Sequence, residues 1–458
     1  MAIITCTPIP GLLTDPRTNW AGRAVVMVDQ RDSALLEKTT CPHCWHSFEP
    51  HSTLWIATHP NLRGDPRLGT DAQRRFLPSR FTPRGGAIDE SGSECTQLAC
   101  PNCHLHVPRL CLGFKPWFVS IFGAPTSGKS YYLAAMTWAL RRKLPAAFRV
   151  SFTDTDATTN QMLAGYEEKL FYNSTPNDLL TLGELIAKTY EEGDLYDTAL
   201  FGADRVQFPR PFLFTIRPQP DHPAAVDADA MSRILCLYDN AGESFLAGRD
   251  SSLRPVTRHL AESSLLLFLF DPTQHQPFRQ RLAAAKMEVA SDIKAGQEVN
   301  RQDLILTEAA SRVRRFAGLR DMEKHDKPLV VIVTKQDVWE SLVPEFKAPE
   351  SMVASSRGLS TSAMNLDRVD DLSRAIRRLL LELTPEVVSA AESFARNVTY
   401  VGVSSLGVAP VRHPTTGRWA VRPADLKPTG VEIPLLLGLS REFQRLVPNG
   451  RRPRRSTE

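Results

Sequence analysis

The sequence predicts an α/β protein with a mostly parallel sheet, preceded by a small cysteine-rich domain. First, an apolar run of strand length and composition, from Trp117 to Phe122, leads into a glycine-containing loop and a helix-forming stretch. Second, later apolar strands alternate with helical patterns, which indicates a sheet of mostly parallel strands; they cover residues 212–216, 234–238, 265–270, 328–333 and 397–403. Third, two Cys-Pro-x-Cys segments precede all of these strands, at 41–44 and 100–103.

The loop after the first strand has the pattern G-x-x-x-x-G-K-S. Its glycines let the backbone wrap closely around an anion, and the N–H groups of the loop and of the helix N-terminus then point at phosphate. We expect Lys129 to reach the β- and γ-phosphates of a nucleotide, and Ser130 to offer its hydroxyl to Mg²⁺. A chance match in a Gly/Ser turn is the alternative, and the flanking strand and helix disfavour it. The expected nucleotide contacts in this segment are Gly123, Ala124, Thr126, Ser127, Gly128, Lys129, Ser130 and Tyr131.

A second motif, Asp239-Asn240-Ala241-Gly242-Glu243, follows the strand at 234–238. An aspartate at the carboxyl end of a buried strand is the second requirement of a phosphate–Mg²⁺ site. In the D-x-x-G form, the N–H of Gly242 could contact a γ-phosphate and move when that phosphate leaves. We therefore expect Asp239 to share Mg²⁺ with Ser130, and we expect Lys129, Asp239 and Glu243 to be the catalytic residues. By itself D-x-x-G is often only a turn; its place after a strand and downstream of the lysine loop favours a functional role.

A third motif, T-K-x-D, follows the strand at 328–333 as Thr334-Lys335-Gln336-Asp337. A carboxylate can accept two parallel hydrogen bonds from guanine, whereas adenine has no matching pair of donors. Because an unpaired buried carboxylate is costly, Asp337 is expected to select guanine. Lys335 is expected to pack along the base and to brace the phosphate loop, and Thr334 belongs to the same nucleotide-binding set. Ser404 and Ser405, at the end of the last strand, are the least specific of the expected base contacts.

Each Cys-Pro-x-Cys segment presents two thiolates from one tight turn, so we expect Cys41, Cys44, Cys100 and Cys103 to hold a tetrahedral Zn²⁺. The long gap between the two segments indicates an insertion, at 61–94, that is rich in Arg, Gly and Pro. We interpret it as a solvated irregular loop, with a basic surface as the alternative; its arginines are Arg63, Arg67, Arg74, Arg75, Arg80 and Arg84. Four thiolates complete a closed structural site, so we expect the spare ligands not to bind metal; these are Cys95, Cys111, His43, His46, His104 and His106.

Composition and charge narrow the classes of protein to which this chain could belong. The chain has 458 residues, 42% of them hydrophobic, enough for two or three domains with a real core. Its formal net charge of +4 is too small to argue by itself for a nucleic-acid-binding protein. There is no apolar run of membrane-spanning length, and the first residues lack the pattern of a signal peptide, so we expect a cytoplasmic protein.

Further elements are expected from the periodicity of apolar residues. They are a strand at 22–30, a strand at 148–152, mostly helical chain at 158–200, helices at 278–294 and 302–319, a β-hairpin at 411–421 and a closing helix at 431–446. About 100 residues separate Ser130 from Asp239. The segment between them would contain the first nucleotide-responsive region, or first switch, and this switch is therefore either large or carries an inserted helical subdomain.

Taken together, Gly123–Ser130, Asp239–Gly242, Thr334–Asp337 and Ser404-Ser405 resemble the ordered motifs of translation-factor-related and Ras-like P-loop GTPases. The resemblance implies a P-loop NTPase three-layer sandwich at 113–447. A zinc-ribbon domain at 1–112 would precede it, and a basic disordered tail at 448–458 would follow. With its zinc ribbon, the layout is most similar to bacterial double-GTPase-type families, which are linked to multi-gene conflict or defence systems. That step is an analogy of fold and layout.

These motifs and the resemblance lead to a first hypothesis, a cytosolic GTP-binding switch that uses GTP, Mg²⁺ and Zn²⁺ and meets protein partners through its switches or its ribbon. Ras-like enzymes have glutamine where this chain has Glu243, and a carboxylate there would be repelled by the γ-phosphate. Hydrolysis is therefore expected to be slow or stimulated by a partner. The switch threonine stays open between Thr198, Thr155 and Thr181.

Two other hypotheses remain at this point. One is a P-loop ATPase with a chance T-K-x-D, and the other is a zinc-ribbon adaptor whose nucleotide site is structural. A nucleic-acid role for the ribbon and its arginines also stays open, and salt-dependent binding to RNA or DNA would reveal it.

Overall fold

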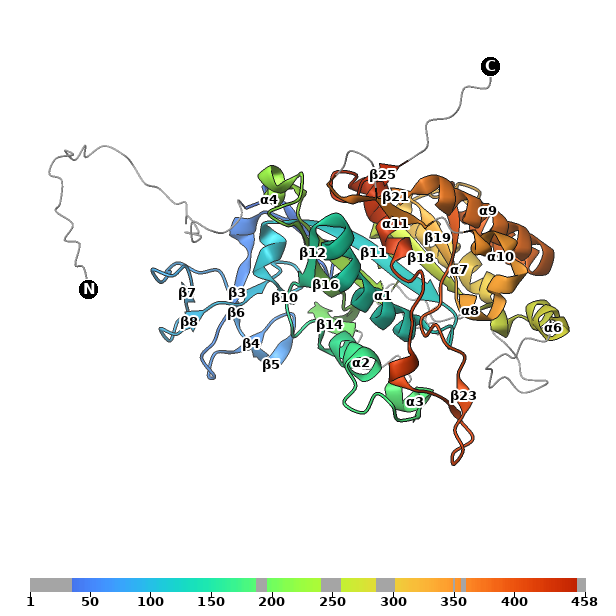
Figure 1. Cartoon of the computed structure of the whole chain (residues 1–458). Coiled ribbons are helices and arrows are strands. Elements are labelled where there is room, and N and C mark those ends of the chain that lie inside the picture. The colour runs from blue at the N-terminus through green and yellow to red at the C-terminus, as the bar shows by residue number, and fades with distance from the viewer. Residues whose placement is uncertain are drawn as a thin grey trace, which may run out of the picture.

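A seven-stranded sheet forms the centre of the molecule (Figure 1). The computed structural model describes residues 35–186, 196–239, 257–285, 301–348, 351–355 and 360–450. The order of the strands across the sheet is β12-β16-β17-β11-β18-β19-β22. Their bounds are β11 (Lys115–Gly123), β12 (Val150–Asp154), β16 (Phe212–Pro218), β17 (Arg233–Asp239), β18 (Leu265–Phe270), β19 (Leu329–Val333) and β22 (Val398–Gly402). The strands from β17 to β22 pair in parallel, while β16 and β12 are antiparallel to their neighbours. The predicted α/β fold with a mostly parallel sheet is therefore confirmed.

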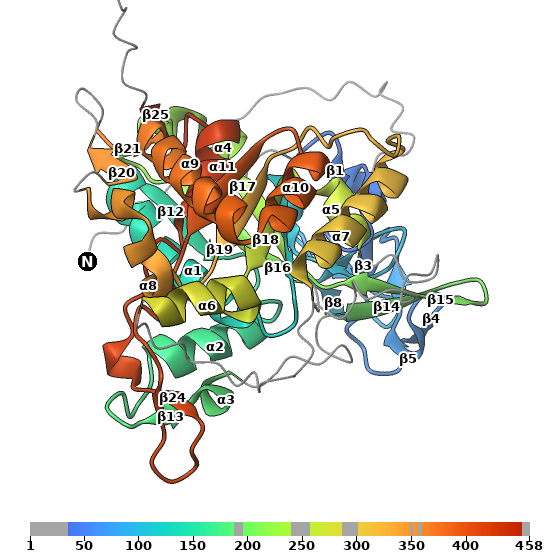
Figure 2. The same ribbon diagram turned by 90° about the vertical axis from the view of Figure 1, so that its right-hand side faces the viewer.

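Helices cover both faces of this sheet, so its strands are apolar on both sides. In β18, Leu265, Leu267 and Leu269 face one core, and the alternate residues face the other. The first core is packed by α1 (Lys129–Lys143), α2 (Gln161–Phe171) and α11 (Ile433–Glu442). The second is packed by α5 (Arg258–Glu262), α6 (Gln276–Ala284), α7 (Gln302–Ala317), α9 (Leu366–Leu383) and α10 (Pro385–Phe394). The helices of the second core lie together in Figure 2.

The cysteine-rich part forms a β module beside β16 and β17. Its four-stranded sheet, in the order β10-β9-β3-β6, contains β3 (Leu54–Ile56), β6 (Arg75–Phe76), β9 (Leu98–Ala99) and β10 (His106–Val107), and β1 (Thr39–Thr40) pairs with β2 (Ser47–Phe48). Its buried side chains share one apolar cluster with Leu213, Ile234, Cys236 and Tyr238 of the central sheet. The module and the sheet are therefore packed together through a common core.

The insertion at 61–94 is not an irregular loop, so that prediction was wrong. It forms two hairpins, β4 (Arg63–Asp65) with β5 (Gly69–Gln73) and β7 (Ala87–Ile88) with β8 (Glu94–Cys95), and it also supplies β6. Strands this short and this polar leave no clear alternation in the sequence. The insertion also contacts a distant part of the chain. The Arg67 guanidinium lies 4.1 Å from the ring centroid of Phe201 and donates to the Leu200 carbonyl oxygen at 3.0 Å.

The chain between α1 and β16 is less helical than expected. A π-helical turn, Leu144–Phe148, continues α1, so the strand predicted from residue 148 begins at Val150. Next come α2, β13 (Leu180–Thr181) and α3 (Leu182–Leu185), and then a hairpin of β14 (Tyr196–Phe201) and β15 (Asp204–Pro209). Figure 2 shows this hairpin alongside β4 and β5. Residues 196–200 are thus a strand, because β14 pairs along its whole length with β15 and buries Ala199 against the cysteine module.

The C-terminal elements follow the prediction. The expected hairpin is formed by β23 (Val411–Arg412) and β24 (Trp419–Val421), and the closing helix is α11. Shorter elements complete the fold: α4 (Ala228–Met231), α8 (Gln336–Trp339), β20 (Val353–Ser355), β21 (Ser362–Asn365) and β25 (Asn449–Gly450). The predicted strand at 22–30, the end of the helix predicted to reach residue 294 and the basic residues from 451 onward lie outside the described residues.

Candidate functional site

The carboxyl ends of five parallel strands meet at one edge of the sheet. Here β11 has β17 on one side and β18 on the other, so the chain winds in opposite directions from it. Open α/β sheets place their ligands outside the carboxyl ends of the strands at such a switch point. The register brings the predicted segments level: Asp239 pairs with Ile121, Gly123 with Leu269, and Val333 with both Phe270 and Gly402. The phosphate loop, Asp239, T-K-x-D and Ser404 therefore all leave the sheet at this edge.

The loop between β11 and α1 is tightly closed. The Lys129 Nζ donates to the carbonyl oxygens of Gly123 at 3.0 Å and Ala124 at 2.9 Å, so the lysine folds back across the loop. Gly128 has a φ of +87°, which favours glycine. A Cβ on Gly123 would lie 2.6 Å from the Leu269 carbonyl oxygen, so any larger residue would push the loop away from β18. α1 then begins at Lys129, and its N-terminus is directed at the space the loop encloses.

A chain of hydrogen bonds joins this loop to T-K-x-D. The Lys335 Nζ donates to Asp271 Oδ2 and to Thr273 Oγ1, both at 2.8 Å. The Gln274 Nε2 donates to Asp271 Oδ2 at 3.1 Å and to Thr126 Oγ1, in the phosphate loop, at 3.3 Å. Asp271 is 1% exposed, so a buried carboxylate holds the two loops at a fixed separation. Lys335 thus reaches the phosphate loop through Asp271 and Gln274.

Sequence reasoning did not identify Asp271 and Gln274 as site residues. A signal existed for Asp271, because it directly follows the apolar strand β18 in the same way that Asp239 ends β17. Its other oxygen, Oδ1, accepts the Thr273 N–H at 2.9 Å and the Thr273 hydroxyl at 2.7 Å. Gln274 carried no signal, because its contact with Thr126 depends on the turn at 272–274.

The two expected base-contacting segments lie against each other. The Ser404 hydroxyl donates to Asp337 Oδ1 and accepts the Gly407 N–H at 2.9 Å. Ser404 also exchanges two backbone hydrogen bonds with Thr429, at 2.9 and 2.8 Å. This arrangement fixes one oxygen of the Asp337 carboxylate toward Ser404. Ser405 follows in the same turn and is partly exposed.

Only the start of the second motif is described. Asp239 ends β17 and is 5% exposed, whereas Gly242 and Glu243 lie outside the described residues. Ser130, the expected partner of Asp239 in holding Mg²⁺, lies in the first turn of α1. The Ser130 hydroxyl and the buried Asp239 carboxylate are oxygen donors of the kind that Mg²⁺ prefers.

The three candidate switch threonines lie in different environments. The Thr155 Oγ1 is 3.0 Å from Thr215 Oγ1, and the Thr181 Oγ1 donates to Glu184 Oε2 at 2.7 Å. Both hydroxyls therefore have protein partners. Thr198 lies in β14, where it pairs with Gln207.

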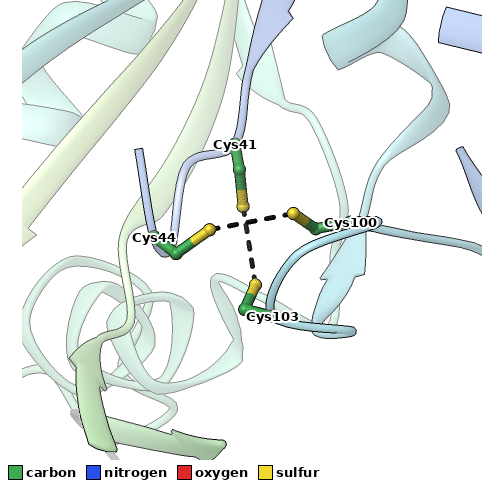
Figure 3. A group of neighbouring side chains, drawn as sticks. All are labelled: Cys41, Cys44, Cys100 and Cys103. Carbon is green, nitrogen blue, oxygen red and sulfur yellow. Dashed lines mark hydrogen bonds between the residues drawn. The ribbon is translucent and has the colours of Figure 1, made fainter. Parts of the chain in front are cut away.

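The four predicted zinc ligands converge in one buried cluster (Figure 3). Their sulfur atoms all lie within 4.8 Å of one another. The Sγ atoms of Cys41 and Cys103 are 3.8 Å apart, and those of Cys44 and Cys100 are 3.7 Å apart. Four sulfurs at about 2.3 Å from a tetrahedral Zn²⁺ would be separated by about 3.8 Å, so the cluster fits this ion.

The two cysteine turns have matching geometry, which explains the fit. In each turn a backbone N–H points at the first sulfur at 3.4 Å: His43 N–H to Cys41 and Asn102 N–H to Cys100. The residue after each second cysteine is left-handed, Trp45 with φ 57° and His104 with φ 61°. Burial raises the pKa of Cys41 well above its ordinary value. A metal ion that binds the sulfur would stabilise the thiolate by its positive charge, and the thiol proton would be released to solvent.

The spare histidines and cysteines of the module have other contacts. The His43 Nε2 lies 3.0 Å from the His106 carbonyl oxygen, the His104 Nδ1 lies 2.8 Å from Asp65 Oδ2, and the Cys95 Sγ lies 3.7 Å from Asp89 Oδ2. Cys111 is buried and His46 is exposed. Within the described residues, the metal-compatible cluster consists of the four predicted cysteines.

Most of the named arginines of the insertion donate to protein acceptors. Their partners are Pro60 for Arg63, Leu200 for Arg67, Glu90 for Arg74, His104 for Arg75 and Asp89 for Arg80. These contacts give the arginines a structural role in the module, which weakens the basic-surface alternative.

Comparisons with known proteins add one distant similarity. No family model matches the chain. It is 23% identical over 409 residues to "Putative ESX-1 scaffolding and assembly protein SaeC" of Mycolicibacterium smegmatis, and the match covers 82% of this chain and 92% of that protein. Across the described residues, no helix has both the length and the apolarity needed to cross a bilayer.

Proposed function

We propose that this protein is a GTP-binding switch that hydrolyses GTP slowly or with the help of a partner, and that a zinc-bound cysteine module serves as its interaction part. One observation carries the proposal: the G-x-x-x-x-G-K-S loop, T-K-x-D and Ser404, far apart in the sequence, are joined by hydrogen bonds at the carboxyl edge of the parallel strands, where Asp239 also ends its strand. If G-x-x-x-x-G-K-S or T-K-x-D were a chance match, the two motifs would not be expected to be linked by hydrogen bonds at one edge of the sheet.

Each motif has a distinct role in the proposed site. The loop N–H groups, Lys129 and the N-terminus of α1 would bind the nucleotide phosphates. Ser130 and the buried Asp239 would hold Mg²⁺, which neutralises charge on the phosphates when bound. Asp337, a partly buried carboxylate oriented by the Ser404 hydroxyl, would accept the two donors of guanine.

Slow hydrolysis follows from the residue after the D-x-x-G motif. Hydrolysis of GTP requires an in-line attack by water, and the protein contributes by positioning groups and neutralising charge. Glu243 brings a carboxylate where a neutral water-positioning side chain would serve better. We therefore expect GTP bound to the resting protein to stay unhydrolysed for many minutes, and we expect faster hydrolysis to depend on a partner.

Competition between nucleotides tests the choice of guanine. We expect the purified protein to bind mant-GTP at least about a hundredfold more tightly than mant-ATP, because two hydrogen bonds to the Asp337 carboxylate are lost with adenine. Asp337→Asn should lose this preference and gain binding to the xanthosine nucleotide, whose C2 oxygen can accept from the amide. The matched control is Asp321→Asn, at an exposed aspartate away from the site. Equal affinity of the unaltered protein for both nucleotides would favour the P-loop ATPase alternative.

The adaptor alternative makes a different prediction for Lys129. If the nucleotide site were only structural, Lys129→Ala would leave the biological activity intact. We expect instead that Lys129→Ala abolishes binding of mant-GTP, because the lysine is the one charged group that folds across the loop. A zinc content of one ion per chain in this variant would show that the cysteine module is unaffected.

The distant relative suggests the setting in which the switch acts. That protein carries the name of an ESX-1 scaffolding and assembly protein, and the match spans nearly its whole length. We propose by analogy that this chain acts in the assembly of a multi-protein complex, and the similarity favours this setting over a defence system. Co-purification of such components with the protein loaded with a non-hydrolysable GTP analogue, but not with GDP, would support this. Co-purification independent of the nucleotide would favour the adaptor instead.

A further inference from the structure

The first cysteine turn is bonded directly to the residue that precedes Asp239. Tyr238 is fully buried at the end of β17. Its hydroxyl donates to the Pro42 carbonyl oxygen at 2.6 Å and accepts the indole N–H of Trp45 at 3.0 Å. Pro42 lies between the two ligands Cys41 and Cys44, and Trp45 follows the second ligand. One tyrosine hydroxyl therefore joins the cysteine turn to the strand that ends in Asp239.

The packing around this hydroxyl reinforces the connection. The Tyr238 ring stacks on His259 of α5, with centroids 5.1 Å apart, and lies 6.0 Å from the ring of Trp45. The Arg258 guanidinium lies over Trp45 at 5.7 Å. β17 ends in Asp239, the first residue of the D-x-x-G motif, and α5 is the next helix described after it. The cysteine turn thus contacts both elements that border the motif.

The same turn also contacts the hairpin that precedes β16. The His43 Nδ1 lies 3.5 Å from Asp197 Oδ2, in β14, and the Arg210 guanidinium pairs with the same carboxylate at 2.6 Å. β14 also contains Thr198, one of the candidate switch threonines. The four residues from Pro42 to Trp45 therefore contact β14 as well as β17 and α5.

We infer that Tyr238 is a positioning residue through which the metal in the four-cysteine cluster sets the Mg²⁺ affinity of the nucleotide site. This inference rests on the proposed function, because it assigns Asp239 to Mg²⁺. A metal bound by Cys41 and Cys44 fixes the conformation of the turn between them. The fixed turn holds the Tyr238 hydroxyl from two directions, and Tyr238 fixes the backbone that presents Asp239.

The coupling must act in both directions, because linkage between two binding sites is reciprocal. If zinc strengthens Mg²⁺ binding in the GTP complex, then GTP with Mg²⁺ must strengthen zinc binding by the same factor. Couplings of this kind are typically five- to 150-fold. With two hydrogen bonds and one stacked ring in the connection, we expect an effect of about tenfold.

Tyr238→Phe is the central test, because phenylalanine keeps the ring and removes both hydrogen bonds of the hydroxyl. The measurement is the release rate of mant-GTP from the zinc-loaded full-length protein as a function of free Mg²⁺. We expect the Mg²⁺ concentration for half-maximal retention to rise about tenfold, while the release rate with no added Mg²⁺ changes by less than twofold. A purely structural defect would accelerate release without Mg²⁺ as well, and that result would overturn the inference. The matched control is Tyr400→Phe, in β22, which removes a hydroxyl bonded to Glu392 of α10 and should leave both quantities unchanged.

Zinc supplies the second arm of the test. Removal of zinc from the unaltered protein should raise the half-maximal Mg²⁺ concentration by the same factor, and removal from Tyr238→Phe should add nothing further. Trp45→Phe, which deletes the indole donor to Tyr238, should give part of the effect and should not add to Tyr238→Phe.

The reciprocal measurement covers the case in which zinc-free protein unfolds. The zinc affinity of the folded protein, measured by equilibrium competition with a chromogenic chelator, should rise about tenfold when GTP and Mg²⁺ are bound. In Tyr238→Phe this rise should be absent. If GTP binds normally but neither zinc removal nor the nucleotide affects the other site, the inference fails and the proposed function stands. If the zinc-loaded protein binds no GTP, both fail.

Discussion

Lys335→Met tests the hydrogen-bonded chain between the β11–α1 loop and the T-K-x-D segment without any nucleotide present. Lys335 is the charged partner of Asp271, which is 1% exposed, at 2.8 Å. Methionine keeps the length of the side chain and removes the charge. Removing one partner of a buried ion pair leaves a buried carboxylate, which typically costs about 3–5 kcal/mol.

The environment of Asp271 reduces this cost. Three other donors remain: the Thr273 N–H, the Thr273 hydroxyl and the Gln274 amide. Lys335 itself is about one-third exposed, so water can enter the space left by its ammonium group. We therefore expect a loss of about 2–3 kcal/mol in the free energy of unfolding.

Urea unfolding followed by tryptophan fluorescence measures this loss, with an unchanged slope showing that the unfolding transition is the same. Lys347→Met, at an exposed lysine, is the matched control and should change stability by less than about 0.5 kcal/mol. Asp271→Asn in the Lys335→Met background should recover about 1–2 kcal/mol, since it removes the uncompensated charge. The reasoning is refuted if Lys335→Met is no more destabilising than Lys347→Met, or if the second substitution recovers nothing.

The remaining predictions concern the metal, the phosphate loop and pH. Cys103→Ser should lose the bound zinc, measured by elemental analysis, and should lower the melting temperature, because one missing thiolate opens a closed four-ligand site. Gly123→Ala should lower the free energy of unfolding measured in urea by about 1–3 kcal/mol, because the new Cβ would lie 2.6 Å from a carbonyl oxygen. The control Gly183→Ala, where a Cβ would meet no atom within 4 Å, should change it by less than about 0.5 kcal/mol. Equal effects of the two substitutions would contradict the steric explanation. Burial lowers the pKa of His222, whose Nδ1 accepts the Ala224 N–H at 2.9 Å. The stabilisation by neutral His222 is therefore present above the ordinary histidine pKa of about 6.5 and is lost as the pH falls through the lowered pKa of the folded protein. The difference in unfolding free energy between the unaltered protein and His222→Gln should therefore shrink on acidification. A difference that grows would refute the assignment.

The sequence predicted the parts whose signal is local. Strand composition, the glycine pattern from Gly123 to Gly128 and the two cysteine turns are set by neighbouring residues, and the structure has each of them where the sequence placed it. The zinc ligands could be predicted because each turn fixes two sulfurs by its own geometry, whatever lies between the turns. The fold class followed because apolar runs buried on both faces must belong to a covered sheet.

Predictions failed where short polar segments depend on distant partners. The hairpins of the insertion and β14 have little apolar alternation, and their strand conformation comes from pairing and from contacts such as that of Arg67 with Phe201. Gln274 could not be identified for the same reason, since its role depends on a contact with Thr126, 148 residues away.

By itself, then, the sequence predicted the chemistry proposed for this protein, with a loop expected to bind phosphate and a carboxylate expected to bind guanine, and it determined the two turns that present four cysteines. Only the tertiary structure decided which of these groups act on one another. It placed the loop and Asp337 on one sheet edge, connected them through Asp271, and packed the first cysteine turn onto Tyr238. Local chemistry is encoded in adjacent residues, whereas coupling between sites requires side chains from distant segments to share one buried space, and folding alone creates that space.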